Sequence, residues 1–160
     1  MLLAAVDHGL SPPGDESLAM NDPLMSQGYD IWTPPLRIAR PTDNIEALLP
    51  FYVGGLGFQV LTRFNDHAGF SGIVLGHPGQ AYHLEFTHQH GHKVGRAPTK
   101  DNLLVLYQPQ RLAYQAAIGA MVDAGFKPVP STNPYWEQHG KTFEDPDGYR
   151  VVLANKSWDR

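Results

Sequence analysis

The stretch LRIARPTDNIEALLPFYVGGLGF, residues 36–58, has the pattern of a strand followed by a helix. Residues 36–40 mostly alternate between apolar and polar side chains, which is typical of a strand. Apolar residues then recur at positions 45, 48, 49 and 52, the spacing of one face of a helix. Thr42 or Asp43 is the expected N-cap, and Gly54-Gly55 is the expected end of the helix.

Working outward from this stretch, the same order of elements occurs twice. Three further strands are expected at residues 58–64, 70–75 and 82–87. A second strand, helix and three strands are expected at 102–107, 109–122, 126–129, 141–144 and 149–154. The last two strands flank Asp145-Pro146-Asp147-Gly148, a turn in which Pro presets φ and Gly supplies a positive φ.

The distance between equivalent positions supports a repeat. Leu36 and Asn102 are 66 residues apart, Gly57 and Gly125 are 68 apart, and Glu85 and Val152 are 67 apart. The sequence therefore predicts an α+β fold of two βαβββ modules, which form a cupped mixed sheet with helices packed outside it. The alternative is an unrelated α+β fold with two helices.

These patterns divide the chain into a tail and one domain. Residues 1–33 are expected to be irregular. The stretch 9–15 is rich in Ser, Pro and Gly, and Pro23 and Pro34 would interrupt any helix. Residues 34–160 are expected to form a single domain, with module one at about 36–87, a linker at 88–101 and module two at about 102–155.

Composition and charge argue against nucleic acid and membranes as partners and indicate a cellular compartment. The formal net charge of −4 and the absence of a Lys/Arg cluster argue against nucleic acid. We find no apolar run near the roughly 20 residues that a membrane span requires. The chain contains no cysteine and its start lacks the pattern of a signal peptide, so a cytoplasmic protein is expected.

Particular segments resemble the vicinal oxygen chelate superfamily, which includes glyoxalase I, extradiol dioxygenases and bleomycin-resistance proteins. The similar segments are Thr42-Asp43, Phe51-Tyr52, Gly55-Leu56-Gly57-Phe58 and the final hairpin from Phe143 to Tyr149. The runs at 37–42, 82–87 and 101–107 also resemble its YycE-like branch. The resemblance implies paired modules, a ligand pocket and a homodimer.

Members of that superfamily that use a metal take one ligand from the first strand and one from the last strand of each module, usually His, Gln or Glu. The matching positions in this sequence are Leu36, Glu85, Asn102 and Val152. Only Glu85 is a good ligand, whereas a stable site needs three or four donors. No cofactor is therefore expected, and a divalent metal is possible but disfavoured by the missing ligands.

Alternation along the strands predicts a pocket with an apolar floor and a few polar groups. Leu36, Ile38, Leu104 and Leu106 belong to the floor, and Arg40, His83, Glu85, Asn102 and Arg150 are the expected polar residues. Arg40 is expected either to clamp a carboxylate or phosphate of the ligand, or to form an ion pair with Glu85.

Other candidate residues leave alternatives open. His83 and Glu85 are two residues apart and should share a face, where they form a hydrogen-bonded pair, an acid–base pair or a non-standard metal site. Tyr135 and Trp136 either close over a flat ligand or pin a loop to the core. His88, His90 and His92 form either a solvated linker or an adventitious metal tract.

Two functions follow from these observations. The first is a protein that binds a small organic molecule in the cupped sheet without the superfamily's metal. The second is a lyase, isomerase or dioxygenase that uses a non-standard metal site or the His83/Glu85 pair. Nucleophilic catalysis has no support, because the sequence has no cysteine and no nucleophile-elbow or phosphate-loop motif.

Overall fold

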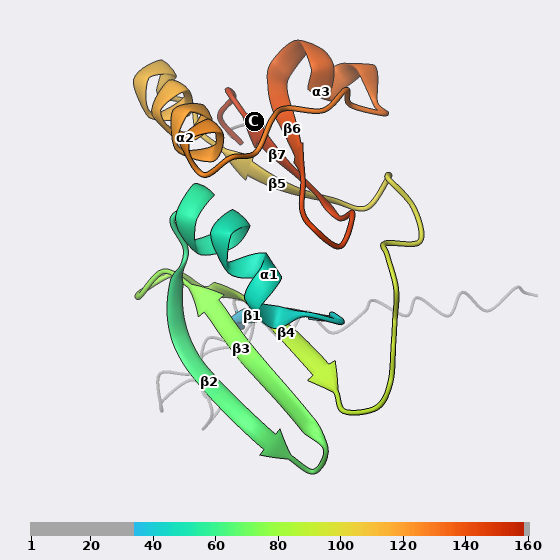
Figure 1. The fold of residues 1–160 in the computed structure, drawn as a ribbon. Coiled ribbons are helices and arrows are strands. Elements are labelled where there is room, and N and C mark those ends of the chain that lie inside the picture. The colour runs from blue at the N-terminus through green and yellow to red at the C-terminus, as the bar shows by residue number, and fades with distance from the viewer. Residues whose placement is uncertain (1–33, 159–160) are drawn as a thin grey trace, which may run out of the picture. The chain divides into compact units, whose positions relative to one another are not determined.

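A computed structural model describes residues 34–158, and Figure 1 shows their arrangement. The expected irregular segment 1–33 lies outside the described residues. The first half contains β1 (Leu36–Pro41), α1 (Ile45–Leu49), the π-helix η2 (Pro50–Gly55), β2 (Gln59–His67), β3 (Phe70–Gly76) and β4 (Tyr82–Gln89). The second half contains β5 (Leu103–Tyr107), α2 (Arg111–Asp123), α3 (Pro134–His139), β6 (Gly140–Glu144) and β7 (Arg150–Ala154).

The two halves share one topology. The strand order is β1-β4-β3-β2 in the first sheet and β5-β7-β6 in the second. In each sheet the first strand runs parallel to the last strand of its half, and the remaining pairs are antiparallel. The predicted α+β class and the repeated order of elements are therefore confirmed.

The second half has one strand fewer than the first. The expected strand at 126–129 is reduced to a single bridge between Val129 and Thr142, in which the Val129 amide donates to the Thr142 carbonyl at 2.8 Å. Val129 stands between Pro128 and Pro130, and neither proline has an amide hydrogen to give to a ladder. The prolines therefore explain why pairing stops at one residue.

The short helix α3 was not predicted. It follows Asn133, whose side chain accepts a hydrogen bond from the Tyr135 amide, and Pro134 occupies its first turn. An N-cap followed by Pro is a known helix start, but the helix spans only Pro134–His139 and leaves no periodic pattern in the sequence.

The start of α1 also differs from the prediction. Asn44 is the N-cap, because its side chain accepts from the Ala47 amide at 3.2 Å. Thr42 instead accepts from the Asn44 amide, and Asp43 accepts from the linker amides of Val94 and Gly95 at 2.8 and 3.0 Å. The expected caps therefore stabilise the preceding turn and the docking of the linker.

The final turn was predicted correctly. The Gly148 amide donates to the Asp145 carbonyl at 2.9 Å, and Gly148 has a φ of 90°. This geometry closes the turn between β6 and β7 and leaves the Asp145 side chain directed into the protein, where it is fully buried.

One core connects both halves. The core face of the first sheet carries Ile73, Leu75, Leu84 and Phe86, and that of the second sheet carries Phe143, Val151 and Leu153. Between the halves, the rings of Phe51 and Phe126 meet edge to face at 4.9 Å, and η2 packs against α2. The helical segments therefore bury their apolar faces against each other as well as against the sheets.

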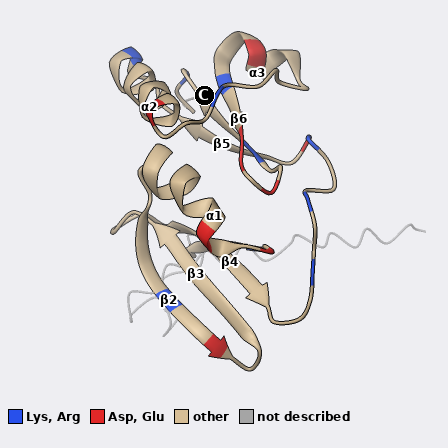
Figure 2. Ribbon diagram, in the orientation of Figure 1, with Lys and Arg blue, Asp and Glu red and all other residues tan. Residues whose placement is uncertain are grey.

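Charged residues occur on strands, turns and helices, with both signs interspersed along the described ribbon (Figure 2). Among the described helices, none has the length and apolar character needed to cross a membrane.

Two adjacent glycines test the contact between η2 and α2. A Cβ atom on Gly55 would lie 2.5 Å from Met121 Sδ, whereas one on exposed Gly54 would lie 3.9 Å from Ala124 Cβ. We expect Gly55→Ala to lower the free energy of unfolding by about 1–3 kcal/mol through overpacking. Gly54→Ala is the matched control and should be neutral or slightly stabilising. Urea unfolding of both variants provides the measurement. Equal changes in unfolding free energy would contradict the close contact between Gly55 and Met121.

Candidate functional site

The register of β1 on β4 fixes which side chains share a face. Ala39 pairs with Glu85 and Arg37 pairs with His83, so these residues lie on one face of the sheet. Residues 36, 38 and 40 pair with Tyr82, Leu84 and Phe86 on the other face, which belongs to the core. The predicted grouping of Arg40 with His83 and Glu85 is therefore wrong by one residue along β4.

Glu85 forms an ion pair with a residue that was not predicted. Arg37 Nη1 lies 3.7 Å from Glu85 Oε2, and the Arg37 and Glu85 side chains are 51% and 18% exposed. His83 shares this face with Glu85, as expected from their spacing, but the carboxylate's charged partner among the described residues is Arg37.

In the second sheet, the two positions that correspond to Ala39 and Glu85 are the apolar residues Val105 and Val152. By register, Leu103 and Val105 pair with Arg150 and Val152, on the face that corresponds to Glu85. Leu36 faces the core side, and Asn102 precedes β5 and is exposed, so neither belongs with Glu85. No group of three or more His, Cys, Asp or Glu side chains within residues 34–158 could hold a metal ion.

Arg40 belongs to a buried polar network that joins the two halves. Its guanidinium donates to the Tyr52 hydroxyl and lies 3.6 Å from Asp145 Oδ2. The Tyr52 hydroxyl donates to the same carboxylate at 2.7 Å, and the Tyr149 amide donates to Asp145 Oδ1 at 2.8 Å. The guanidinium also lies over the Tyr149 ring, 4.1 Å from its centroid. The expected Arg40–Glu85 ion pair is therefore wrong, and Arg40 has a structural partner instead.

Burial controls the ionisation of this network. Desolvation raises the pKa of Tyr52 well above its ordinary value, so the hydroxyl stays protonated and can donate. Desolvation also raises the pKa of Asp145, while the Tyr52 hydroxyl, the Arg40 charge and the Tyr149 amide oppose that rise. These three partners allow a carboxylate to remain in the core.

Arg150, Tyr135 and Trp136 lie in other contacts. Arg150 is 4% exposed and donates to Glu144 and to the Pro130 carbonyl, both at 3.1 Å. The Trp136 ring lies 6.4 Å from that of Tyr107, in edge geometry, and Tyr135 stands on α3 with 46% exposure. The structure therefore does not bring these three residues together with Arg40, His83 or Asn102.

Two of the linker histidines are held by local contacts. His88 Nδ1 lies 3.0 Å from the Thr42 carbonyl oxygen, and His90 Nε2 lies 2.9 Å from Ser71 Oγ. His90 and His92 are exposed and His88 is half-buried, so two of the three histidines face solvent as a solvated linker would, and the binding of a metal stays a prediction.

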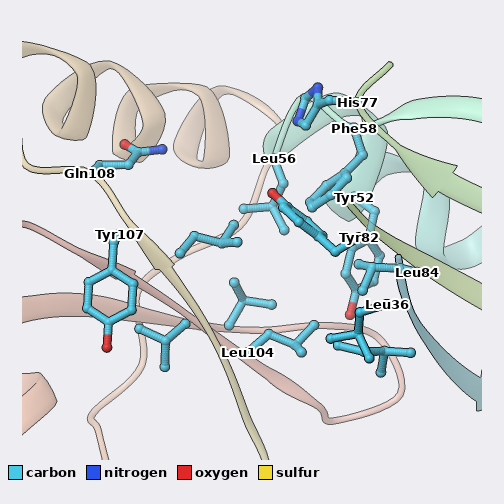
Figure 3. A pocket seen from close by; sticks show the side chains of 14 residues that line it. Leu36, Tyr52, Leu56, Phe58, His77, Tyr82, Leu84, Leu104, Tyr107 and Gln108 are labelled. Atoms are coloured by element: carbon cyan, nitrogen blue, oxygen red, sulfur yellow. The ribbon is translucent and has the colours of Figure 1, made fainter. Parts of the chain in front are cut away.

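The clearest cavity lies on the core side of β1 and β4, between the two halves (Figure 3). Its volume is about 510 Å³. Figure 3 shows Tyr107 and Gln108 on one wall, and Tyr52, Phe58 and His77 on the wall opposite. The lining side chains come from both halves and are Leu36, Ile38, Tyr52, Leu56, Phe58, His77, Tyr82, Leu84, Leu104, Val105, Leu106, Tyr107, Gln108 and Val151.

Sequence reasoning identified part of this cavity. Leu36, Ile38, Leu104 and Leu106 were expected in the pocket floor and do line it. On β4 the lining residues are Tyr82 and Leu84 rather than the predicted His83 and Glu85. No Asp, Glu, Lys or Arg is among the described lining residues, so this cavity is uncharged except through His77.

Comparisons with known proteins agree with this architecture. Residues 36–87 match the model of the YycE-like N-terminal domain, and residues 101–155 match that of the YycE-like C-terminal domain. The uncharacterized protein YycE of Bacillus subtilis (strain 168) is 40% identical over 120 residues, which cover 75% of this chain and 86% of YycE.

Solved structures extend the comparison. The crystal structure of YycE from Bacillus subtilis has a TM-score of 0.73 at 38% identity, covering 79% of this chain and 93% of that one. The trypanothione-dependent glyoxalase I of Leishmania major has a TM-score of 0.59 at 18% identity, covering 76% and 85%. TnmS3, an antibiotic-binding protein from Streptomyces sp. CB03234, has a TM-score of 0.56 at 20% identity, covering 81% and 99%. The last two similarities concern the fold alone.

Removing one hydroxyl group, that of Tyr52, tests how much the buried network contributes to stability. Tyr52→Phe removes the donor to Asp145 and should lower the free energy of unfolding by about 1–3 kcal/mol, because the carboxylate loses a buried partner. Tyr135→Phe is a control at a half-exposed ring and should change stability by less than about 0.5 kcal/mol. Urea unfolding at neutral pH compares them, and a neutral Tyr52→Phe would show that the network contributes little.

The effect of Tyr52→Phe on the free energy of unfolding should also depend on pH. The raised pKa of Tyr52 means that the unfolded chain ionises this hydroxyl near the ordinary value of 10.0 while the folded protein does not. Its contribution to stability is therefore present below pH 10 and is lost as the pH rises above it. We expect the difference in unfolding free energy between the wild type and Tyr52→Phe to shrink between about pH 9 and 11.

Proposed function

Because this chain belongs to the YycE-like family of the vicinal oxygen chelate superfamily, we propose that it binds a small organic molecule in the cavity between its two halves. The observation that carries the proposal is the cavity of about 510 Å³ with an apolar lining drawn from both halves. The expected homodimer and cytoplasmic location stay predictions.

The size and lining of this cavity support a binding site. Ligand pockets of about 300–1,000 Å³ are lined mainly by apolar and aromatic side chains with a few polar groups. The lining here has that composition, with three tyrosines, Phe58, His77 and Gln108 among aliphatic residues. An apolar ligand would gain about 25 cal/mol for each Å² that it removes from water.

We also propose that binding needs no metal. The donor set supports this proposal: of the superfamily's four expected ligand positions, only Glu85 carries a good ligand. On the same face, the guanidinium of Arg37 is the positive partner of Glu85, and the corresponding second-sheet residues, none of which is a metal ligand, are Leu103, Val105, Arg150 and Val152. One carboxylate that is already paired falls short of the three or four donors of a stable site.

An enzyme remains the second candidate. The observation in its favour is that His83 and Glu85 lie on one face of β4, where a carboxylate can orient an imidazole for acid–base chemistry. Such a lyase, isomerase or dioxygenase would act on the face opposite the cavity. Variants at Glu85 therefore separate the two candidates, because Glu85 does not line the cavity.

Binding can be tested with a neutral, environment-sensitive naphthalene dye. We expect saturable binding of one dye per chain and at least about tenfold weaker binding by Leu36→Asp, because a carboxylate at the apolar rim must be desolvated. Leu36 lines the cavity and is 56% exposed, so its replacement should leave the core intact. Leu112→Asp is the matched control at an 82% exposed residue outside the lining. Fluorescence titration measures both, and equal affinities would place the dye elsewhere.

Metal independence has its own measurement. A metal that binds only the folded protein would raise the melting temperature. When Ni²⁺, Zn²⁺, Mn²⁺ or Fe²⁺ is added to untagged protein, we therefore expect no rise in melting temperature that depends on Glu85. Glu85→Ala is compared with the wild type in the same assay. A stoichiometric metal that the wild type retains and Glu85→Ala loses would overturn this proposal and favour the enzyme.

A further inference from the structure

Three neighbouring strands of the first sheet bring a carboxylate, a hydroxyl and an imidazole together. The pairing of β2 with β3 shifts between residues 64 and 67, so Asn65 and Asp66 of β2 together stand opposite Ser71 of β3. A bulge of this kind re-aims the side chains of the bulged strand. His90 directly follows β4, the other neighbour of β3, and its amide donates to the Gly69 carbonyl at 2.9 Å. The register alone therefore places Asp66, Ser71 and His90 at one end of the sheet.

The three side chains are in contact. Ser71 Oγ lies 2.9 Å from His90 Nε2, and His90 Nδ1 lies 3.5 Å from Asp66 Oδ1. The carboxylate favours the tautomer that carries its proton on Nδ1, which leaves Nε2 free to accept from the Ser71 hydroxyl. The order hydroxyl, imidazole, carboxylate is the one in which a base activates a nucleophilic serine.

The backbone fixes the carboxylate in this arrangement. Asp66 and Ala68, with φ of 48° and 52°, are the non-glycine residues of positive φ within residues 34–158. Ala68 lies in the turn between β2 and β3, whereas Asp66 lies inside β2, at the bulge. Left-handed backbone is unfavourable for a residue with a Cβ atom and persists where the surrounding structure enforces it. The Asp66 amide also donates to Ser71 Oγ at 3.2 Å, so the bulge holds this residue to the serine at two points.

Exposure to water limits the chemistry of this cluster. The His90 and Asp66 side chains are 44% and 75% exposed, and Ser71 is half-buried. A solvated site gives little electrostatic stabilisation to a tetrahedral intermediate. The substrate must therefore have a leaving group that departs readily, such as the phenolate of an aryl ester, rather than the amine of an amide.

We propose that Ser71 is a nucleophile toward aryl esters of small carboxylic acids, with His90 as its general base and Asp66 as a positioning residue for the imidazole. No sequence motif predicted this activity, because three separate strands supply the residues. The activity is distinct from ligand binding in the cavity, whose lining includes none of the three.

The reaction balances without a cofactor. Ser71 Oγ bonds to the ester carbonyl carbon while its proton passes to His90 Nε2. The bond from that carbon to the phenolic oxygen then breaks, and the phenol leaves with the proton from His90. Water next adds to the acyl-serine and gives a proton to His90, which returns it to Ser71 Oγ as the carboxylic acid departs.

The full chain and 4-nitrophenyl acetate provide the test. After acid quenching, peptide mass spectrometry should find an acetyl group on Ser71 of the wild type and none on Ser71 of His90→Gln. Release of 4-nitrophenol should slow at least about tenfold in Ser71→Ala and in His90→Gln. The double variant should be no more than about twofold slower than either single one, because the two residues act as a unit.

Two further variants complete the experiment. Asp66→Asn should lower kcat about threefold or more and leave KM within about twofold, because the carboxylate orients the base and does not touch the ester. His92→Gln is the matched control, since His92 is an exposed histidine two positions beyond His90. Its rate should stay within about twofold of the wild type.

Several results would overturn the proposal. One is the absence of acetyl-Ser71 in the wild type, and another is its persistence in His90→Gln. Equal rates in Ser71→Ala and the wild type, or an equal loss in His92→Gln and His90→Gln, would assign the hydrolysis to surface imidazoles instead. An unchanged kcat in Asp66→Asn would remove the carboxylate from the proposed arrangement.

Discussion

The fold depends on a buried carboxylate that both halves of the chain satisfy together. Asp145 comes from the last turn, whereas the hydroxyl and guanidinium that meet it come from Tyr52 and Arg40 near the start of the domain. Removing a carboxylate from water is costly unless its partners replace the lost hydration. The halves therefore cannot separate or rotate without exposing a charge to an incomplete shell, and this requirement also fixes the Tyr52 ring as a wall of the cavity.

The first sheet keeps two kinds of chemistry apart on its two faces. Arg37, His83 and Glu85 lie on one face, whereas the other face carries the apolar lining of the cavity and, at Arg40, the buried network. The strand period of two produces this separation, because neighbouring residues on β4 point to opposite sides. Strand β4 thus places Glu85, which stands at a metal-ligand position of the superfamily, on one face. The same strand places Tyr82 and Leu84 in the apolar cavity on the other face.

Much of the fold could be predicted, because repetition and turn chemistry are local properties of a sequence. The 36–58 stretch, its second copy and the Gly148 turn needed no tertiary information. The face of β4 could not be read in the same way, since alternation alone does not say which face meets the core. The contact between Tyr52 and Asp145 was also beyond prediction, because the two residues are 93 positions apart and no local pattern links them.

The two prolines around Val129 have a consequence for how the second sheet ends. An outer strand normally presents a row of free amides and carbonyls, which can recruit a strand from another molecule and so begin aggregation. Beside β6, Pro128 and Pro130 have no amide hydrogen and the Val129 amide is already given to Thr142, so this segment has no free amide with which to recruit a further strand. One of the two outer strands of the first sheet, β2, contains no proline and carries exposed Val60 and Leu61. The β2 edge therefore lacks the protection that the prolines give to β6, which makes β2 a place to add a protective lysine or proline.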